Sequence, residues 1–271
     1  MTDSLHKLAD GERAAAIAIA SRVGATARAH DIDGRQGAVD VELVYPDGSV
    51  AALEVSSCAG QGVRQRDSLL AADGNEWPAP GAATWDIRVG SPETIPELRV
   101  RYGRIIRALE QHGMTSVDLP HRSASPSELA DLEWLESTDV TFSRMSTRSG
   151  REPVVYVLPH GASGMVDDQL VGLGDAVVML LQQPNQLRHI EKLRRSGCRE
   201  THLFLVLHEG ALPFAQMSAL MGRVKNLPEC SAPPLPGGLT HLWFVSVYSH
   251  VLVETSGRTW RFHDLMDETE R

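Results

Sequence analysis

Two acidic residues in the first third of the chain, Asp40 and Glu54, are the side chains whose type and spacing best suggest chemistry. They lie in the segment VDVELVYPDGSVAALEVSS, residues 39–57, where two apolar runs flank a Pro-Asp-Gly turn. This pattern predicts a β-hairpin. Carboxylates on neighbouring strands repel each other, and a hard cation such as Mg²⁺ relieves the repulsion by binding their oxygens.

The length of the turn decides whether the two carboxylates meet. A two-residue turn would place them on opposite faces of the hairpin. A three-residue loop over 46–48 pairs Tyr45 with Ser49 instead. This loop begins with proline, which suits the first turn position, and ends with glycine, which suits the left-handed position. In that register Asp40 lies directly across from Glu54.

The three-residue loop also separates apolar from polar side chains. One face then carries only apolar residues: Val39, Val41, Leu43, Ala51, Leu53 and Val55. The other face carries Asp40, Glu42, Glu54 and Ser56. Since a one-residue slip would scramble both faces, the hydrophobic pattern supports this register. A solvated hairpin face and a divalent-metal site both explain the polar side, and the apolar neighbours of Glu54 favour the metal site.

Together with a helix predicted over 10–23, this hairpin resembles the core of the PD-(D/E)XK nuclease superfamily, the restriction-endonuclease-like fold. The resemblance covers residues 10–57. It implies that Asp40 is the first acid and Glu54-Val55-Ser56 the (D/E)-x-K tripeptide, and that the two acids bind Mg²⁺ or Mn²⁺ to activate a water for phosphodiester hydrolysis. It also implies an assisting, metal-binding role for Glu12 on the preceding helix.

Ser56 stands where the superfamily has a lysine. A serine can hydrogen-bond within the metal's shell, but it cannot carry the positive charge that stabilises developing negative charge. Either another cation reaches the site from a nearby helix or the site is inactive. Lys192 is the candidate, on a helix that Asn185 can cap and that also carries Gln186 and His189. A solvated helix lysine is the competing interpretation.

Strand and helix patterns alternate along the chain, which indicates an α/β fold with a mixed sheet. We expect a single α/β domain over 1–271, with a restriction-endonuclease-like core in 8–60 and 184–255 and a large insertion at about 76–183. The Ser- and Pro-rich stretch 113–131 is the best linker candidate. The expected core elements are helix 10–23, strands 25–31, 39–45 and 49–57, helix 185–196 and strand 201–208.

Composition excludes several classes of protein. The 42% apolar residues suffice for a sizeable core, and the formal net charge of −9 disfavours a general nucleic-acid coat. Cys58, Cys198 and Cys230 show neither a paired nor a zinc-binding spacing, which indicates a reducing compartment. We see no signal peptide and no run of about 20 apolar residues, so we expect a cytoplasmic protein without a membrane partner.

Other candidate sites are weaker. The loop from His160 to Gly164 lacks the spacing of a serine-hydrolase turn, and the glycine pair near 172–174 lacks the third glycine of a dinucleotide site. His202, His208 and His241 lie on or beside apolar strands, which is more typical of core histidines than of ligands. The basic run from Arg188 to Arg199 could meet phosphates, although a solvated helix face also explains it.

Two functions of different class stay open. The first is a divalent-metal-dependent nuclease with Mg²⁺ or Mn²⁺ as cofactor and nucleic acid as partner. The second is a non-catalytic interaction protein that keeps the fold and binds a protein partner, which the missing lysine and the acidic net charge favour. The substrate and the oligomeric state stay open.

Overall fold

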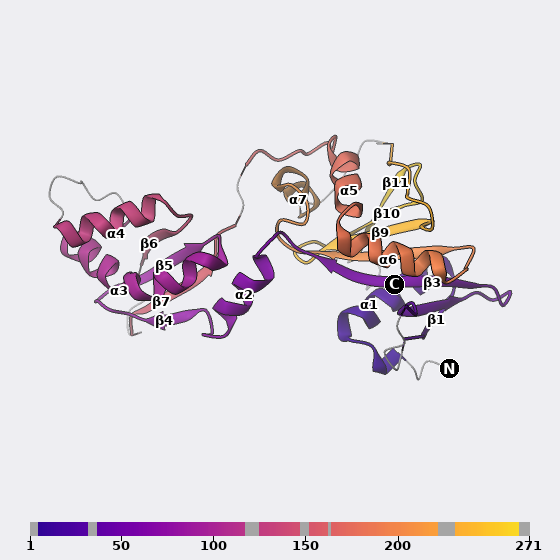
Figure 1. Cartoon of the computed structure of the whole chain (residues 1–271), viewed down its shortest axis with the longest axis horizontal. Coiled ribbons are helices and arrows are strands. Elements are labelled where there is room, and N and C mark those ends of the chain that lie inside the picture. Colours follow the sequence, from indigo (N-terminus) through magenta and orange to yellow (C-terminus); the bar gives the residue numbers. More distant parts are fainter. Residues whose placement is uncertain are drawn as a thin grey trace. The chain divides into compact units, whose positions relative to one another are not determined.

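The computed structural model describes residues 5–31, 37–116, 125–146, 152–161, 164–221 and 231–265. The chain divides into two compact units, one made of Met1–Ala59 with Ser163–Arg271 and the other of Gly60–Ala162 (Figure 1). The second unit begins and ends earlier than the insertion expected at about 76–183. The reason is packing: Leu70 belongs to the core of the second unit, whereas residues 173–181 belong to the core of the first.

The first unit is built on a seven-stranded sheet in the order β1-β2-β3-β8-β9-β10-β11. Its strands are β1 (Thr26–Ala29), β2 (Val41–Val44), β3 (Val50–Cys58), β8 (Thr201–Leu207), β9 (His241–Ser246), β10 (Val251–Thr255) and β11 (Trp260–Asp264). Its helices are η1 (Leu5–Lys7), α1 (Asp10–Val23), α5 (Leu173–Leu181), α6 (Pro184–Arg195) and α7 (Phe214–Met221). Strands β1 to β3 pair antiparallel, and β8 joins β3 in parallel. The expected α/β class with a mixed sheet is therefore confirmed.

Helix α1 occupies the residues predicted for it. Gly24 ends it in the left-handed conformation (φ +71°), as helix C-termini favour. Ala9 is the N-cap, and Glu12 Oε2 accepts a hydrogen bond from the Ala9 N–H at 3.2 Å.

The hairpin has the predicted three-residue loop. The Tyr45 N–H donates to the Ser49 carbonyl at 2.9 Å, and Gly48 adopts φ +83°. The ladder pairs Val41 with Leu53 and Val44 with Val50, the register that sets residue 40 opposite residue 54. The expected hairpin register is therefore confirmed.

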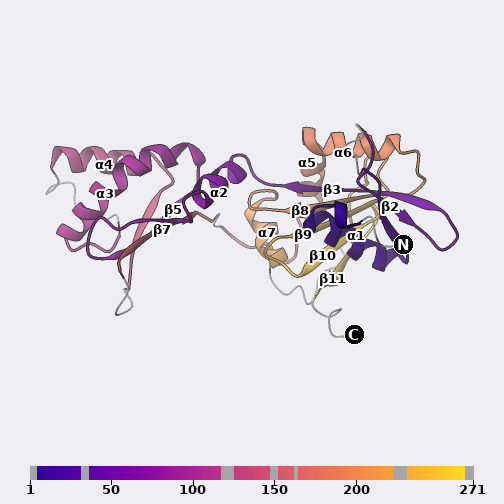
Figure 2. The ribbon, with the colours of Figure 1, turned by 90° about the horizontal axis from the view of Figure 1, so that it is seen from below.

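Both faces of the sheet are covered. Helix α1 packs on one face against Val41, Leu43 and Leu53, and helices α5 and α6 pack on the other (Figure 2). Consequently residues 51–54 in the middle of β3 have no exposed surface. Val39, expected beside Val41, packs instead in the cluster under α5 and α6, because β2 begins only at residue 41.

The second unit has its own four-stranded sheet, in the order β4-β7-β5-β6. Its strands are β4 (Glu76–Pro78), β5 (Thr84–Val89), β6 (Thr141–Met145) and β7 (Val154–Pro159). Its helices are α2 (Val63–Ala71), η2 (Pro92–Thr94), α3 (Ile95–Gln111) and α4 (Pro126–Glu136). The expected linker 113–131 is thus partly helical, and its residues 117–124 lie outside the described part of the chain. Among the described helices, none is long and apolar enough to cross a membrane.

Candidate metal and phosphodiester site

Strand β3 and helix α6 contact each other through two matching rows of side chains. On β3, alternate residues face the helix, as strand geometry requires. On α6, residues three apart share one face. The contacts are Lys192 Nζ with Glu54 Oε1 at 2.5 Å, His189 Nε2 with Ser56 Oγ at 3.0 Å and Gln186 Nε2 with Cys58 Sγ at 3.0 Å.

Glu54 is the buried centre of this arrangement, with no exposed surface. Its Oε1 accepts from Lys192 Nζ and lies 2.8 Å from His189 Nδ1. Its Oε2 is buried and has no hydrogen-bond partner among the described residues. A buried carboxylate needs compensation by charge and hydrogen bonds, so one oxygen is satisfied and the other lacks a ligand.

Asp40 lies immediately before β2 and faces the same ammonium group. Its Oδ2 accepts from the Val55 N–H at 2.8 Å, and its Oδ1 is 3.6 Å from Lys192 Nζ. Burial, followed by the negative charge of Glu54, raises the pKa of Asp40 to about 6, although the Val55 N–H and Lys192 oppose this rise. A bound cation would favour the ionised form of this carboxyl group.

Lys192 reaches both carboxylates while its side chain stays 27% exposed. Burial disfavours its charged form, but the hydrogen bond to Glu54 and the charges of Glu54 and Asp40 outweigh burial and raise the pKa of Lys192. The lysine is therefore charged and is paired with the two acids rather than solvated.

The structure brings four of the five predicted site residues together, namely Asp40, Glu54, Ser56 and Lys192. We call these four, with His189, the carboxylate site. Glu12 is separate: among the described residues it makes no hydrogen bond or ion pair with them, and its carboxylate caps its own helix. Its charge nevertheless contributes to the raised pKa of Asp40.

His189 was expected on the same helix as Lys192, but without a role in the site. In the structure it links Ser56 to Glu54. The available signal was the spacing of residues 186, 189 and 192 on one helix face, which matches the alternation of residues 54, 56 and 58 on a strand.

A divalent cation fits the donor set of the carboxylate site. Asp40 and Glu54 supply the hard oxygen ligands that Mg²⁺ and Mn²⁺ prefer. The unpartnered, buried Oε2 of Glu54 is the atom most in need of such a ligand. In this structure the Lys192 ammonium compensates the two acids.

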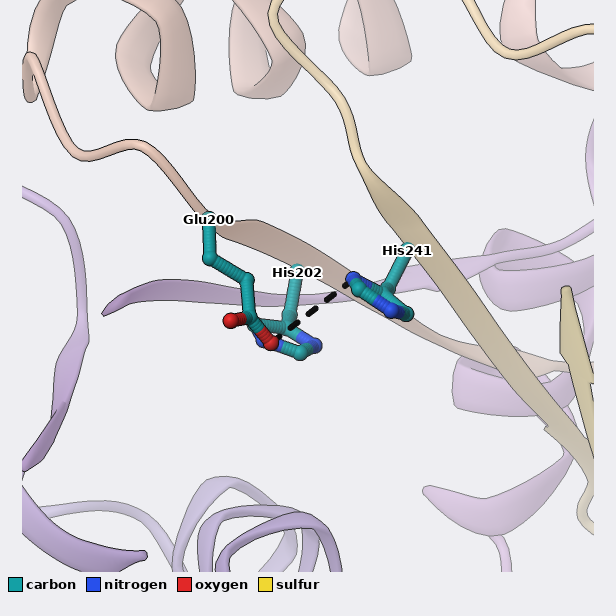
Figure 3. A group of neighbouring side chains, drawn as sticks. All are labelled: Glu200, His202 and His241. Carbon is teal, nitrogen blue, oxygen red and sulfur yellow. Dashed lines mark hydrogen bonds and ion pairs between the residues drawn. The ribbon is translucent and has the colours of Figure 1, made fainter. Parts of the chain in front are cut away.

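A second group of metal-ligand types, Glu200, His202 and His241, lies on the other face of the sheet (Figure 3). Glu200 Oε1 is 3.0 Å from His202 Nε2 and 3.9 Å from His241 Nδ1. The two imidazole rings stack with centroids 4.6 Å apart. Proximity alone would suggest a metal centre here.

Hydrogen bonding argues against a metal at this second group. Trp243 Nε1 donates to His202 Nδ1 at 3.0 Å, and an indole N–H can only donate. In neutral His202 the proton must then be on Nε2, which donates to Glu200 and offers no lone pair to a metal. The His202 bond is the main reason that the pKa of Glu200 falls to about 2, and the Tyr45 hydroxyl also donates to this carboxylate, at 2.7 Å. We therefore interpret the group as a hydrogen-bonded network.

No protein-family model, curated protein or solved structure matches this chain. Function is therefore inferred from the geometry of the carboxylate site.

Proposed function

We propose that this protein is a divalent-metal-dependent phosphodiesterase that acts on nucleic acid and has a restriction-endonuclease-like core. One observation carries the proposal: Lys192 Nζ lies 2.5 Å from Glu54 Oε1 and 3.6 Å from Asp40 Oδ1. The positive charge that Ser56 cannot supply is thus provided from α6. The site therefore has a positively charged side chain even though Ser56 replaces the lysine of the tripeptide.

The order of the core elements also supports the proposal. Helix α1 precedes the antiparallel strands β1, β2 and β3, and after the second unit helix α6 leads into β8, which pairs with β3 in parallel. The first four of these elements begin within residues 10–57, which carry the resemblance, and α6 and β8 are the two elements expected to complete the core. Helix α6 contacts both β3 and β8, which places Lys192 and His189 over the acidic strand.

The chain's own groups have distinct roles in such a reaction. Asp40 and Glu54 would hold Mg²⁺ or Mn²⁺, which supplies Lewis-acid stabilisation of the phosphate and lowers the pKa of a bound water. The Val55 N–H fixes Asp40, and His189 fixes Glu54. Lys192 contributes a fixed positive charge in a partly desolvated position, where it stabilises negative charge more strongly than in water.

The test is cleavage of single- and double-stranded DNA and RNA in Mg²⁺ or Mn²⁺, with wild type, Asp40→Asn and Glu54→Gln. We expect metal-dependent cleavage that both substitutions reduce by at least about 100-fold, the scale of one lost electrostatic group. Glu42→Gln is the matched control, because this acid of the same hairpin pairs with Arg28 and His30 instead. Absence of cleavage on every substrate, with no calorimetric metal binding, would favour the non-catalytic interaction protein.

A further inference from the structure

Ser56, His189 and Glu54 form a continuous hydrogen-bonded chain across β3 and α6. His189 Nδ1 is 2.8 Å from Glu54 Oε1, and His189 Nε2 is 3.0 Å from Ser56 Oγ. A carboxylate only accepts hydrogen bonds, so the proton of the neutral imidazole is on Nδ1. The Nε2 lone pair then accepts the hydroxyl proton of Ser56. A nucleophile, a base and an orienting carboxylate in this order form the arrangement that activates a serine.

The hydrogen-bonded series Ser56–His189–Glu54 is fixed at its buried end and partly exposed at the other. Glu54 is buried and is held a second time by Lys192, so the orienting carboxylate cannot swing away. The His189 side chain is 26% exposed and Ser56 is partly exposed, so the pair is not sealed within the core. His189 contacts Oε1 of Glu54, whereas Oε2 has no described hydrogen-bond partner. His189 and a metal ion therefore need not compete for the same oxygen.

We propose that Ser56 is the nucleophile of the carboxylate site and attacks the phosphorus of a phosphodiester; this substrate class rests on the proposed function. Lys192 is paired with Glu54 and Asp40, so the choice of an anionic phosphoester follows from the cation of the proposed function and not from Lys192 alone.

The reaction balances in two steps. In the first, Ser56 Oγ bonds to phosphorus, its proton moves to His189 Nε2, and the leaving alcohol departs with that proton as its P–O bond breaks. In the second, a water oxygen bonds to the phosphorus of the seryl phosphodiester and gives one proton to His189, and this proton passes to Ser56 Oγ as the Oγ–P bond breaks and the phosphomonoester leaves.

The test is covalent labelling of the full-length protein by a fluorophosphonate, a phosphorus electrophile that reacts with activated serines. The reaction is run in EDTA and the adduct is located by peptide mass spectrometry. We expect one adduct on Ser56, none in Ser56→Ala, and a rate at least about 100-fold lower in His189→Ala, the lower scale of base catalysis. Ser57→Ala is the matched control and should label at the wild-type rate, because the next residue of a strand points to the opposite face.

Failure of wild type to form an adduct on Ser56 would overturn the proposal, and so would labelling of His189→Ala at the wild-type rate. Because no metal is present, neither result depends on metal-dependent cleavage. Cleavage without labelling would mean that water, not Ser56, attacks the phosphate. Labelling without cleavage would keep an activated Ser56 and refute the proposed phosphodiesterase.

Discussion

At the residue scale, the carboxylate site places two acids and one ammonium group in a largely desolvated position. Glu54 is wholly buried and depends on Lys192 and His189 for compensation, whereas the Asp40 side chain keeps 18% of its surface exposed. Removing one partner of a buried charge costs more than the pair contributes. Loss of either compensating partner of Glu54 should therefore destabilise the fold.

Asp40 makes the stability of the metal-free protein depend on pH. Its pKa is raised from 3.8 to about 6 by burial and by Glu54, so between these values the folded protein binds more protons than the unfolded chain. The contribution is fully present below pH 3.8 and is lost as the pH rises through about 6. We predict that Asp40→Asn is more stable than wild type at about pH 8, by up to about 3 kcal/mol, and differs little at about pH 4.

Urea unfolding in EDTA at the two pH values measures this difference in the free energy of unfolding. Glu42→Gln serves as the control, because its carboxylate pairs with Arg28 near the surface, and it should bring no comparable gain. A variant Asp40→Asn that is less stable than wild type at the higher pH would contradict the assignment of Asp40 as a strained acid.

At the element scale, local sequence chemistry predicts much of what positions the site. The bounds of α1 follow from its glycine stop, and the hairpin register follows from the proline-to-glycine loop and the alternation of Val41, Leu43 and Leu53. The contact between β3 and α6 is harder to predict, because the whole second unit separates residues 54 and 192 along the sequence. Lys192 was expected as the candidate cation, but the link through His189 depends on how two faces pack, which the spacing of residues 186, 189 and 192 alone does not fix.

The hairpin loop offers a test of this register through two glycines. Gly48 (φ +83°) and Gly11 both have no atom within 4 Å of an added Cβ, so crowding does not distinguish them. We predict that Gly48→Ala destabilises the protein by about 1 kcal/mol, because alanine resists a positive φ. Gly11→Ala, within α1, should instead stabilise it by up to about 1 kcal/mol. Thermal and urea unfolding give both values, and equal effects of the two substitutions would contradict the loop conformation.

At the scale of the whole molecule, two units with separate cores share one chain. The core of Gly60–Ala162 is built around Trp85, Leu98 and Phe142, and the carboxylate site lies wholly within the other unit. An insertion at about 76–183 within a single domain was expected from the sequence, but the bounds of the second unit were not, because alternating patterns do not reveal which sheet a strand joins. The geometry of the site therefore depends on β3, on α6 and on Asp40 before β2, all within the first unit.

We predict that a fragment of residues 60–162 folds by itself, because its sheet and helices bury their own apolar side chains. Circular dichroism should show a mixed helix and strand spectrum and a cooperative thermal transition. A fragment that stays unfolded in dilute buffer, while the full chain is folded, would contradict the division into two units.

Calorimetric titration of the full-length protein with Mn²⁺ tests the central claim most directly. We predict one binding site in wild type, weakened at least about 10-fold by Asp40→Asn and by Glu54→Gln, the scale of a lost ligand. Glu42→Gln and Glu200→Gln should bind as wild type does. Lys192→Met should bind Mn²⁺ more tightly, because its ammonium no longer compensates the two acids. No binding in wild type, or binding that Glu200→Gln removes and Glu54→Gln leaves intact, would contradict a metal-dependent carboxylate site.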